Sequence, residues 1–291
     1  MKMSIVTASL NQGPFIRDCI ESVRRQQSAV AWEHIIADGG STDETLAILE
    51  SYEHLSWKSE PDEGQSDAFN KGQHQASGDW IIWLNADDFL MPGALDAFAA
   101  AATRDPSADG FYSDYYYVDA EGRVLKRRRP VRFNPSMVTY IGPYVPTSGS
   151  VYHRRIFESG ILLDKNFRIC MDRDFLAHLG SHGFRLEHVR GYFSAFREHG
   201  DNVHLQSVQG DVERRERMKR KAAAEHELIE QRYGLRLGHS SVVRRATRAA
   251  LAAYFRAYYR AEKLVRGMYA DAVVDRLGGG RVGSSTLWMR D

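Results

Sequence analysis

Hydrophobic and polar positions follow two alternating patterns along the first hundred residues. Short apolar runs are each followed by a longer stretch in which apolar residues recur at helical spacing. The apolar runs cover residues 3–8, 33–38, 55–60 and 80–85, and the helical stretches cover 14–27, 42–53, 66–76 and 92–102. Short apolar runs are typical of buried strands, and strands that alternate with helices favour a parallel sheet. We therefore predict an α/β fold.

The pattern changes after residue 110. Residues 110–129 indicate two strands joined by a glycine-containing turn, and residues 150–156 indicate another strand, so that the sheet becomes mixed. All eight prolines lie at or before Pro146, and the sequence past residue 211 is rich in Ala, Arg, Glu and Tyr, as expected of long helices. We predict an α/β domain over 1–210, a helical basic region over 211–277 and a flexible Gly/Ser-rich tail over 278–291.

Composition and charge narrow the class of protein. With 291 residues, 43% hydrophobic and 26% charged, the chain is typical of a soluble globular protein. Cys19 and Cys170 are far apart and lack metal-type spacing, which favours a reducing compartment. No apolar run reaches the ~20 residues that span a bilayer, and the start lacks a signal-peptide pattern, so we expect a cytoplasmic protein. A net charge of +1 without a recognisable motif argues against a nucleic-acid partner.

Acidic side chains follow two of the predicted strands. The run "EHIIAD" ends in Asp38, and "WIIWLNADD" ends in Asp87 and Asp88. Ligands of open α/β sheets bind at the carboxyl ends of the strands, and a carboxylate at a buried edge needs a hydrogen-bonding partner or a cation. Two interpretations remain open for Asp87 and Asp88: they bind a ligand, or they cap the helix that begins near Pro92.

Two predicted helix starts carry further polar residues. Ser41 and Glu44 have the spacing of a capping box, which leaves the preceding strand-end acid available to a base or ribose. The segment "PDEGQSDAFNKG" places Asp67, Asn70 and Lys71 at the opening of a helix, with Asp67 and Lys71 on one face. An ordinary loop and helix start is the alternative interpretation of this segment.

Five segments, in this order, closely resemble inverting family 2 glycosyltransferases. They are "SIVTASLNQGPFI", "IIADGGSTDET", "SEPDEGQSDAFNKG", "WIIWLNADD" and "MDRDF". The resemblance covers roughly residues 3–205 and implies a Rossmann-like GT-A fold, a nucleotide-sugar donor, with a UDP-sugar favoured, and a glycan or lipid-linked acceptor. The nucleotide-sugar site that it implies is lined by Thr7, Ala8, Asn11, Asp38, Asp67, Asn70, Lys71, Asn85 and Ala86.

The resemblance also implies a metal site. The sequence "NADD" stands where the family has its DxD motif, with Asn85 in place of the first aspartate. We expect Asp87 to be the main ligand of Mn²⁺ or Mg²⁺ and Asp88 to support it, because hard oxygen ligands favour these ions. His199, in "FREHGDNVH", resembles the family's histidine that completes the metal or diphosphate site. A solvated or structural histidine is the alternative.

The catalytic base is expected within "RICMDRDFLAHLGSHGF". Inversion at an anomeric carbon requires a group that takes the proton from the attacking hydroxyl. If this segment is helical, Asp172 shares the stripe of Phe175 and Leu176, whereas Asp174 lies on another side. Burial on the apolar stripe would raise the pKa of Asp172 and make it a better base. The resemblance also places the catalytic acid here, and a helix-dipole role is the alternative.

A basic amphipathic helix is predicted over 242–277. Apolar residues such as Leu251, Phe255 and Tyr258 recur at helical spacing, and Arg256 and Arg260 flank them. The pattern fits packing on the catalytic domain, self-association with a second subunit, and contact with an anionic membrane surface. We expect packing first and peripheral contact with the inner face of the cell membrane second.

Together these features predict a metal-dependent inverting glycosyltransferase of surface polysaccharide or glycoconjugate synthesis. The alternative is a non-catalytic nucleotide-sugar binding protein, in which Asn85 marks a decayed metal site. A nucleotidyltransferase would need a glycine-rich basic loop for a triphosphate near the first strand, and "TASLNQGPF" does not offer one.

Overall fold

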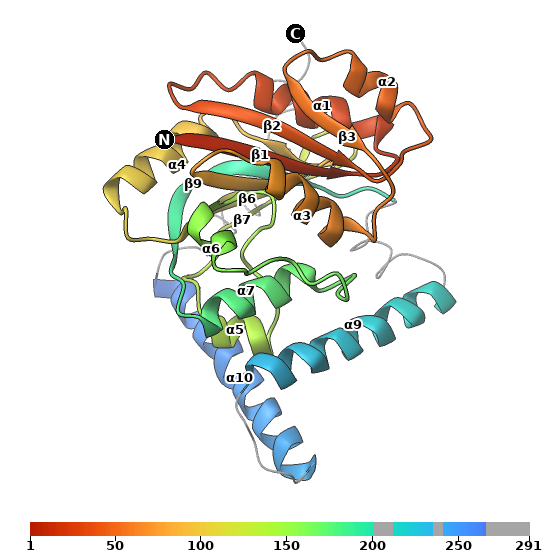
Figure 1. The fold of residues 1–291 in the computed structure, drawn as a ribbon. Coiled ribbons are helices and arrows are strands. Elements are labelled where there is room, and N and C mark those ends of the chain that lie inside the picture. Colours follow the sequence, from red (N-terminus) through yellow and green to blue (C-terminus); the bar gives the residue numbers. More distant parts are fainter. Residues whose placement is uncertain (201–211, 235–240, 266–291) are drawn as a thin grey trace.

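The computed structural model of the protein describes residues 1–200, 212–234 and 241–265 (Figure 1). Within these ranges nine strands form one mixed sheet in the order β3-β2-β1-β4-β8-β6-β9-β5, with β7 paired to β6. The strands are β1 Lys2–Ser9, β2 Ala31–Asp38, β3 Leu55–Ser59, β4 Trp80–Asn85, β5 Phe89–Leu90, β6 Gly110–Val118, β7 Val124–Arg128, β8 Ser150–His153 and β9 Leu186–Arg197. The helices are α1 Gly13–Arg24, α2 Thr45–Glu50, α3 Gln65–Gln75, α4 Ala94–Arg104, α5 Pro135–Tyr140, α6 Arg154–Glu158, α7 Met171–Ser181, α9 Val212–Tyr233 and α10 Ser241–Val265.

The amino-terminal half of the sheet is parallel, as the sequence predicts. Strand β1 pairs in parallel with β2 and β4, and β2 pairs in parallel with β3. The carboxyl ends of these strands therefore meet at one edge of the sheet. There Ser9 is paired with Asp38, and Ala8 is paired with Asn85.

Helices cover both faces of this parallel half, and the strand side chains alternate between them. Ile81 and Trp83 of β4 pack with α3 and α7 in one hydrophobic cluster. Ile82 and Leu84 pack with α1 and α4 in another. This two-sided burial explains why β4 reads as a continuous apolar run rather than an alternating one. In Figure 1, α3 and α7 accordingly lie across the sheet from α1 and α2.

The second half of the sheet is mixed. Strand β8 pairs antiparallel with both β4 and β6, whereas β6 and β9 are parallel. The predicted pair of strands over 110–129 is confirmed as β6 and β7, which are antiparallel. The predicted strand over 150–156 is too long, because α6 begins at Arg154. The side chain of His153 caps that helix by accepting a hydrogen bond from the N–H of Arg155 (3.1 Å).

The carboxy-terminal helices pack on the α/β domain. Helix α9 buries Ile229 completely in the cluster that includes α7, and α10 packs Phe255 against Met137 and Tyr140 of α5. Packing on the domain is thus confirmed for the described part of 242–277. The rest of that segment and the tail predicted over 278–291 lie outside the described residues. None of the described helices is both long enough and apolar enough to cross a bilayer.

Candidate active site

Asp88 anchors the end of β4 from inside the protein. It is fully buried. Its carboxylate accepts hydrogen bonds from Asn85 Nδ2 (2.8 Å), Ser148 Oγ (2.6 Å) and the backbone N–H of Arg197 (2.9 Å). Burial first, and the neighbouring charge of Asp87 second, raise the pKa of Asp88 to about 8. Its oxygens face protein donors, so Asp88 holds β4 and β9 together at this edge.

Asp87 faces a histidine from the end of β9. Asp87 Oδ2 lies 3.0 Å from His199 Nε2. His199 is buried, and its ring lies against Phe15 of α1 with the ring centroids 4.3 Å apart. The interpretation of His199 as a solvated loop histidine is therefore wrong, and the structure brings together two of the three residues predicted to bind the metal, Asp87 and His199.

Arg197 fastens the turn that carries Asp87. Its buried guanidinium donates to the backbone oxygens of Asp87 (2.9 Å) and Ala120 (2.6 Å) and to Asp18 Oδ2 (2.8 Å). The same side chain lies over the ring of Phe15. Strand β9 thus fixes both acids of "NADD", one through a backbone N–H and the other through a side chain.

Neither acid caps a helix. Between them and the next helix lies the short strand β5, and α4 begins at Ala94 with Gly93 as its N-cap and no capping side chain. The alternative interpretation of Asp87 and Asp88, as helix caps, is therefore wrong. Their burial and their contacts need another explanation.

The residues at this edge fit a divalent cation with few protein ligands. Asp87 offers a carboxylate oxygen, and the His199 nitrogen faces that oxygen, so one ion between them could contact both. Among the described residues, no three His, Cys, Asp or Glu side chains come together as a complete metal site. Mg²⁺ is commonly held by one or two carboxylates together with water and the phosphates of a substrate, and this edge suits such an arrangement.

The end of β2 is organised differently from the prediction. Asp38 accepts hydrogen bonds from the N–H groups of Gly40 and Ser41 and from the hydroxyls of Ser41 and Ser59. A carboxylate has about four acceptor sites, so a nucleoside would have to replace one of these donors. The predicted capping box is wrong, because α2 begins only at Thr45 and the Ser41 hydroxyl bonds to Asp38.

The predicted residues after β1 form the adjoining wall. Thr7 and Ala8 are buried in the strand, and the Thr7 hydroxyl lies 3.0 Å from His34 Nε2. Asn11 has a positive φ of 52° and bridges to the loop after β2. Its N–H donates to Ser41 Oγ, and its Oδ1 accepts from the N–H of Thr42. Asn11 therefore shapes the loop at the carboxyl edge.

The beginning of α3 contains the predicted pair of Asp67 and Lys71. The Nζ atom of Lys71 lies 3.3 Å from Oδ2 of Asp67, as the spacing of the two residues predicts. The Asn70 amide makes two hydrogen bonds with the backbone of Leu163, so it joins α3 to a segment far along the chain. Sequence spacing alone does not indicate this long-range role.

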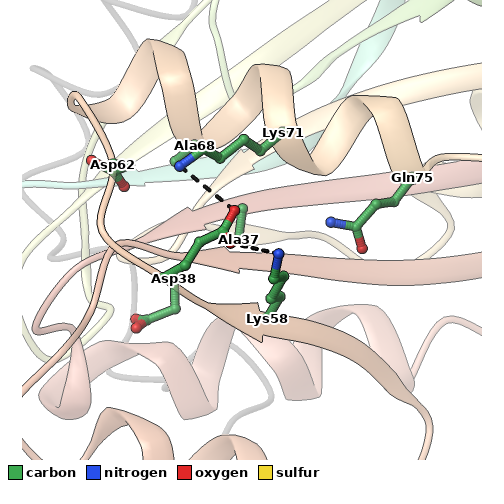
Figure 2. A pocket seen from close by; sticks show the side chains of 8 residues that line it. Ala37, Asp38, Lys58, Asp62, Ala68, Lys71 and Gln75 are labelled. Carbon is green, nitrogen blue, oxygen red and sulfur yellow. Dashed lines mark ion pairs between the residues drawn. The ribbon is translucent and has the colours of Figure 1, made fainter.

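A small pocket lies beside α3 at the ends of β2 and β3 (Figure 2). It is lined by Ala37, Asp38, Lys58, Glu60, Asp62, Ala68, Lys71 and Gln75. Glu60 pairs with Lys58 (2.5 Å) and Lys71 (3.6 Å) across it. Two predicted nucleotide-site residues, Asp38 and Lys71, thus border one pocket, whereas Ala86 is buried in the cluster under α1 and α2.

Asp172 lies in the first turn of α7 and is half-buried. Its Oδ1 accepts a hydrogen bond from the N–H of Arg173 (2.7 Å). Burial raises the pKa of Asp172 to about 6, although that hydrogen bond and the Arg173 charge act in the opposite direction. The predicted rise is confirmed. A carboxyl group with this pKa is ionised at neutral pH and is more basic than an ordinary aspartate.

Asp174 departs from the helical-stripe prediction. Only 1% of this residue is exposed, because α9 covers the side of α7 that the periodicity assigns away from the core. Arg232 of α9 lies 3.4 Å from its Oδ1, and burial raises the pKa of Asp174 to about 6 as well. The two acids of α7 thus share a raised pKa, but Asp174 is paired with a guanidinium.

The first turn of α3 connects the carboxyl edge of the sheet to the start of α7. Gln65 Nε2 donates to Asn85 Oδ1 at the end of β4 (2.8 Å). The next residue, Ser66, places its hydroxyl 3.3 Å from the sulfur of Met171, the first residue of α7. The first turn of α3 therefore contacts both the end of β4, just before Asp87 and Asp88, and the residue that precedes Asp172.

A sequence profile described as "Glycosyl transferase family 2" matches residues 4–161, which is more than half of the chain. The chain belongs to glycosyltransferase family 2. An uncharacterized glycosyltransferase of Mycobacterium tuberculosis is 32% identical over 179 residues, which cover 60% of this chain and 67% of the relative. A PGL/p-HBAD biosynthesis glycosyltransferase of Mycobacterium bovis is 37% identical over 103 residues, covering 34% of this chain and 40% of the relative. The protein is a glycosyltransferase, as the five segments predict.

Solved structures confirm the GT-A fold of this family 2 glycosyltransferase. S. aureus TarS in complex with UDP-GlcNAc superposes with a TM-score of 0.57 at 18% identity, covering 79% of this chain and 72% of the other. A mannosyltransferase of Pyrobaculum calidifontis in complex with GDP-Man and Mn²⁺ has a TM-score of 0.57 at 15% identity, covering 96% of this chain and 75% of the other. At such identities the likeness shows the fold.

Sequence reasoning missed three residues that shape the site of this glycosyltransferase: Gln65, Ser148 and Arg197. Arg197 has the clearest signal, because it ends the apolar stretch "GYFSAF" and a buried strand rarely ends in an unpaired guanidinium. Gln65 and Ser148 act through contacts with β4 from distant segments. Neither position has a local pattern that indicates this role.

Proposed function

We propose that this glycosyltransferase is a metal-assisted, inverting enzyme that transfers a sugar from a UDP-sugar to a glycan or lipid-linked acceptor. One observation carries the proposal. The first turn of α3 contacts both Asn85, which precedes the Asp87–His199 pair, and Met171, which precedes Asp172, an acid whose pKa is raised to about 6. These contacts support a shared site for the diphosphate and the acceptor.

On the donor side, Asp87 and His199 would hold a Mn²⁺ or Mg²⁺ ion, and Asp88 would keep Asp87 in place through the shared turn. Such an ion, when bound, supplies positive charge for the diphosphate leaving group. The nucleotide would lie along the carboxyl edge. We propose that its surroundings include Thr7, Ala8, Asn11, Asp38, Asp67, Asn70, Lys71, Asn85 and Ala86, with Asp38 and Asn70 acting through the loops that they hold.

On the acceptor side, Asp172 would act as the general base. Its carboxylate takes the proton from the acceptor hydroxyl as the hydroxyl oxygen bonds to the anomeric carbon. The bond between that carbon and the donor phosphate oxygen breaks on the opposite face, and the nucleoside diphosphate leaves with the electron pair. Attack from the opposite face inverts the configuration at the anomeric carbon.

Two solved structures and one relative support the proposed class of donor and the proposed metal ion. TarS was solved with UDP-GlcNAc and the Pyrobaculum mannosyltransferase with GDP-Man and Mn²⁺. A relative named for PGL/p-HBAD biosynthesis supports a biosynthetic role in glycoconjugate formation.

Peripheral membrane contact is part of the proposal for the acceptor. Helix α10 packs Phe255 on α5 and leaves Tyr254 and Tyr258 exposed, as it does Arg256 and Arg260. Aromatic rings with flanking arginines suit an anionic lipid surface at the inner face of the cell membrane. Replacing both tyrosines and both arginines by serine should abolish flotation with anionic liposomes, and equal flotation of the two proteins would refute this contact.

The catalytic proposal is tested by the release of nucleoside diphosphate from UDP-, GDP- and dTDP-sugars, with and without Mn²⁺. We expect release from at least one donor, stimulation by Mn²⁺, and loss of release in Asp172→Asn while donor binding in a thermal-shift assay persists. Thermal stabilisation by a donor without release from any of them, with acceptor extracts present, would favour the non-catalytic nucleotide-sugar binding protein instead.

A further inference from the structure

The start of α7 has no capping side chain of its own. Its N-cap residue is Cys170, which makes no side-chain cap hydrogen bond. The first N–H groups of a helix need acceptors, and the Asp172 carboxylate accepts those of Arg173 and of Asp172 itself. The N–H groups of Arg168, Ile169 and Cys170, just before the helix, point to a carboxylate that comes from α9.

Glu225 supplies this carboxylate. Its Oε1 accepts the N–H of Arg168 (3.1 Å), and its Oε2 accepts those of Ile169 (2.9 Å) and Cys170 (2.8 Å). Glu225 is buried, with 5% of the residue exposed. A carboxylate with three N–H donors at the positive end of a helix is held by strong charge-assisted hydrogen bonds. A residue 55 positions after Cys170 thus binds the N–H groups of the backbone that leads into the helix of the proposed base.

Two further residues of α9, Ile229 and Arg232, contact the same loop, which covers residues 164–170. Ile229, one turn after Glu225, is fully buried in the cluster that contains Phe167. Arg232 pairs with Asp164 (2.7 Å) and lies 5.0 Å from the ring centroid of Phe167. One face of α9 therefore holds the loop 164–170 at three points.

The opposite side of this loop contacts the opening of α3. Lys165 pairs with Glu63 (2.9 Å) and lies 3.6 Å from Asp67. The Arg168 guanidinium donates to the backbone oxygen of Glu63. The loop thus contacts α9 on one side and the segment predicted to contact the nucleotide on the other, and the Glu225 hydrogen bonds join α9 to the backbone that leads into Asp172.

We propose that Glu225 is a positioning residue for sugar transfer: it occupies the N–H groups ahead of α7 and so leaves the Asp172 carboxylate available to the acceptor hydroxyl. The inference rests on the proposed role of Asp172 as the base. Asp172 is the next acid along the chain after those N–H groups, so without the Glu225 carboxylate we expect Asp172 to accept hydrogen bonds from them. A carboxylate that accepts additional N–H hydrogen bonds is a weaker base, and it is turned toward its own helix.

The test compares Glu225→Gln with Glu227→Gln in the full chain. Gln keeps the size of the side chain but removes its charge and turns an NH₂ group toward the loop N–H groups. Glu227 lies on the same helix and is exposed, which makes it a matched control. The assay is release of UDP from UDP-GlcNAc, or of the nucleoside diphosphate from the best donor of the panel above.

For Glu225→Gln we expect kcat to fall at least about tenfold with the donor KM unchanged, because the base is misplaced while the donor edge is intact. The acidic limb of kcat against pH should move to lower pH, since Asp172 becomes a weaker base. Glu225→Asp, which keeps the charge on a shorter side chain, should recover part of the rate. Amide hydrogen exchange in residues 166–172 should be faster in Glu225→Gln and unchanged in Glu227→Gln.

Three outcomes separate the possibilities. Equal kcat and pH profiles for the two glutamine variants would overturn the inference. A lower kcat with an unmoved acidic limb and no recovery in Glu225→Asp would show a role in folding alone and would also overturn it. Asp172→Asn, measured in parallel, tests the proposed function separately: full turnover of that variant refutes the base, whatever Glu225 does.

Discussion

The pH dependence of turnover is a sensitive test of Asp172 as the general base, because the pKa of this acid in the folded protein is unusual. Burial raises it from 3.8 to about 6. A base must be ionised to accept a proton, so the active fraction is roughly one-eleventh at pH 5 and ten-elevenths at pH 7. We therefore expect kcat/KM, which reports the ionisation of the free enzyme, to fall about tenfold between pH 7 and pH 5. An aspartate at its ordinary pKa would lose less than about 10% over the same interval.

The assay is the initial rate of nucleoside diphosphate release between roughly pH 4.5 and 8.5, with far-UV circular dichroism to confirm folding at each pH. Asp172→Asn should lower kcat by about 10²- to 10⁴-fold, the usual contribution of a general base. Asp174→Asn is the matched control, because Asp174 has a similar pKa but is paired with Arg232 under α9. It should keep the acidic limb of the wild type.

Protonation of Asp172 and Asp174 does not unfold the protein at acidic pH. Unfolding caused by these two acids therefore cannot produce the acidic limb of the rate. Their pKa values in the folded protein lie above the ordinary 3.8, so the folded chain binds these protons more tightly than the unfolded chain. Their contribution to stability is fully present below pH 3.8 and is lost as the pH rises through about 6. An acidic limb centred below pH 5 in the wild type, or an Asp172→Asn protein with wild-type kcat, would refute the reasoning.

Three further substitutions test other parts of the structure. Asp87→Asn removes the charge that faces His199, and we expect Mn²⁺ to lose its effect on donor affinity in isothermal titration calorimetry; undiminished Mn²⁺ dependence would contradict this role. Ile229→Ala should lower the free energy of unfolding by about 2–4 kcal/mol in urea titrations, because the side chain is fully buried, whereas exposed Leu228→Ala should change it by less than about 0.5 kcal/mol. Arg197→Lys cannot reach Asp18, Asp87 and Ala120 together and should cost about 2–4 kcal/mol; a change within about 0.5 kcal/mol would disprove the fastening of the Asp87 turn.

The local sequence pattern is enough to predict a strand or helix when that pattern itself determines which side chains are buried. Strand β4 is apolar on both faces and is predicted within its observed bounds, because helices cover the sheet on either side. The strand predicted over 150–156 extends past its observed end at His153, because the capping of α6 by His153 depends on side-chain geometry rather than on periodicity.

Features of the candidate site that depend on residues close in sequence can be predicted from the sequence. Features that depend on contacts between distant segments cannot. The Asp67–Lys71 pair and the raised pKa of Asp172 follow from helical spacing and an apolar stripe. The burial of Asp174 does not, because the covering helix α9 lies about sixty residues later in the chain. The capping box failed for a similar reason: Ser41 bonds to Asp38 and Asn11, and Asn11 belongs to the loop after another strand.

The most direct test of the active site is a crystal structure of the protein with Mn²⁺ and UDP. We predict an anomalous manganese peak in bonding contact with Asp87 and the UDP phosphates, with the uridine along the carboxyl edge of β1 and β2. A manganese ion bound elsewhere, with Asp87 still paired only to protein groups and the UDP phosphates away from the end of β4, would contradict the proposed site.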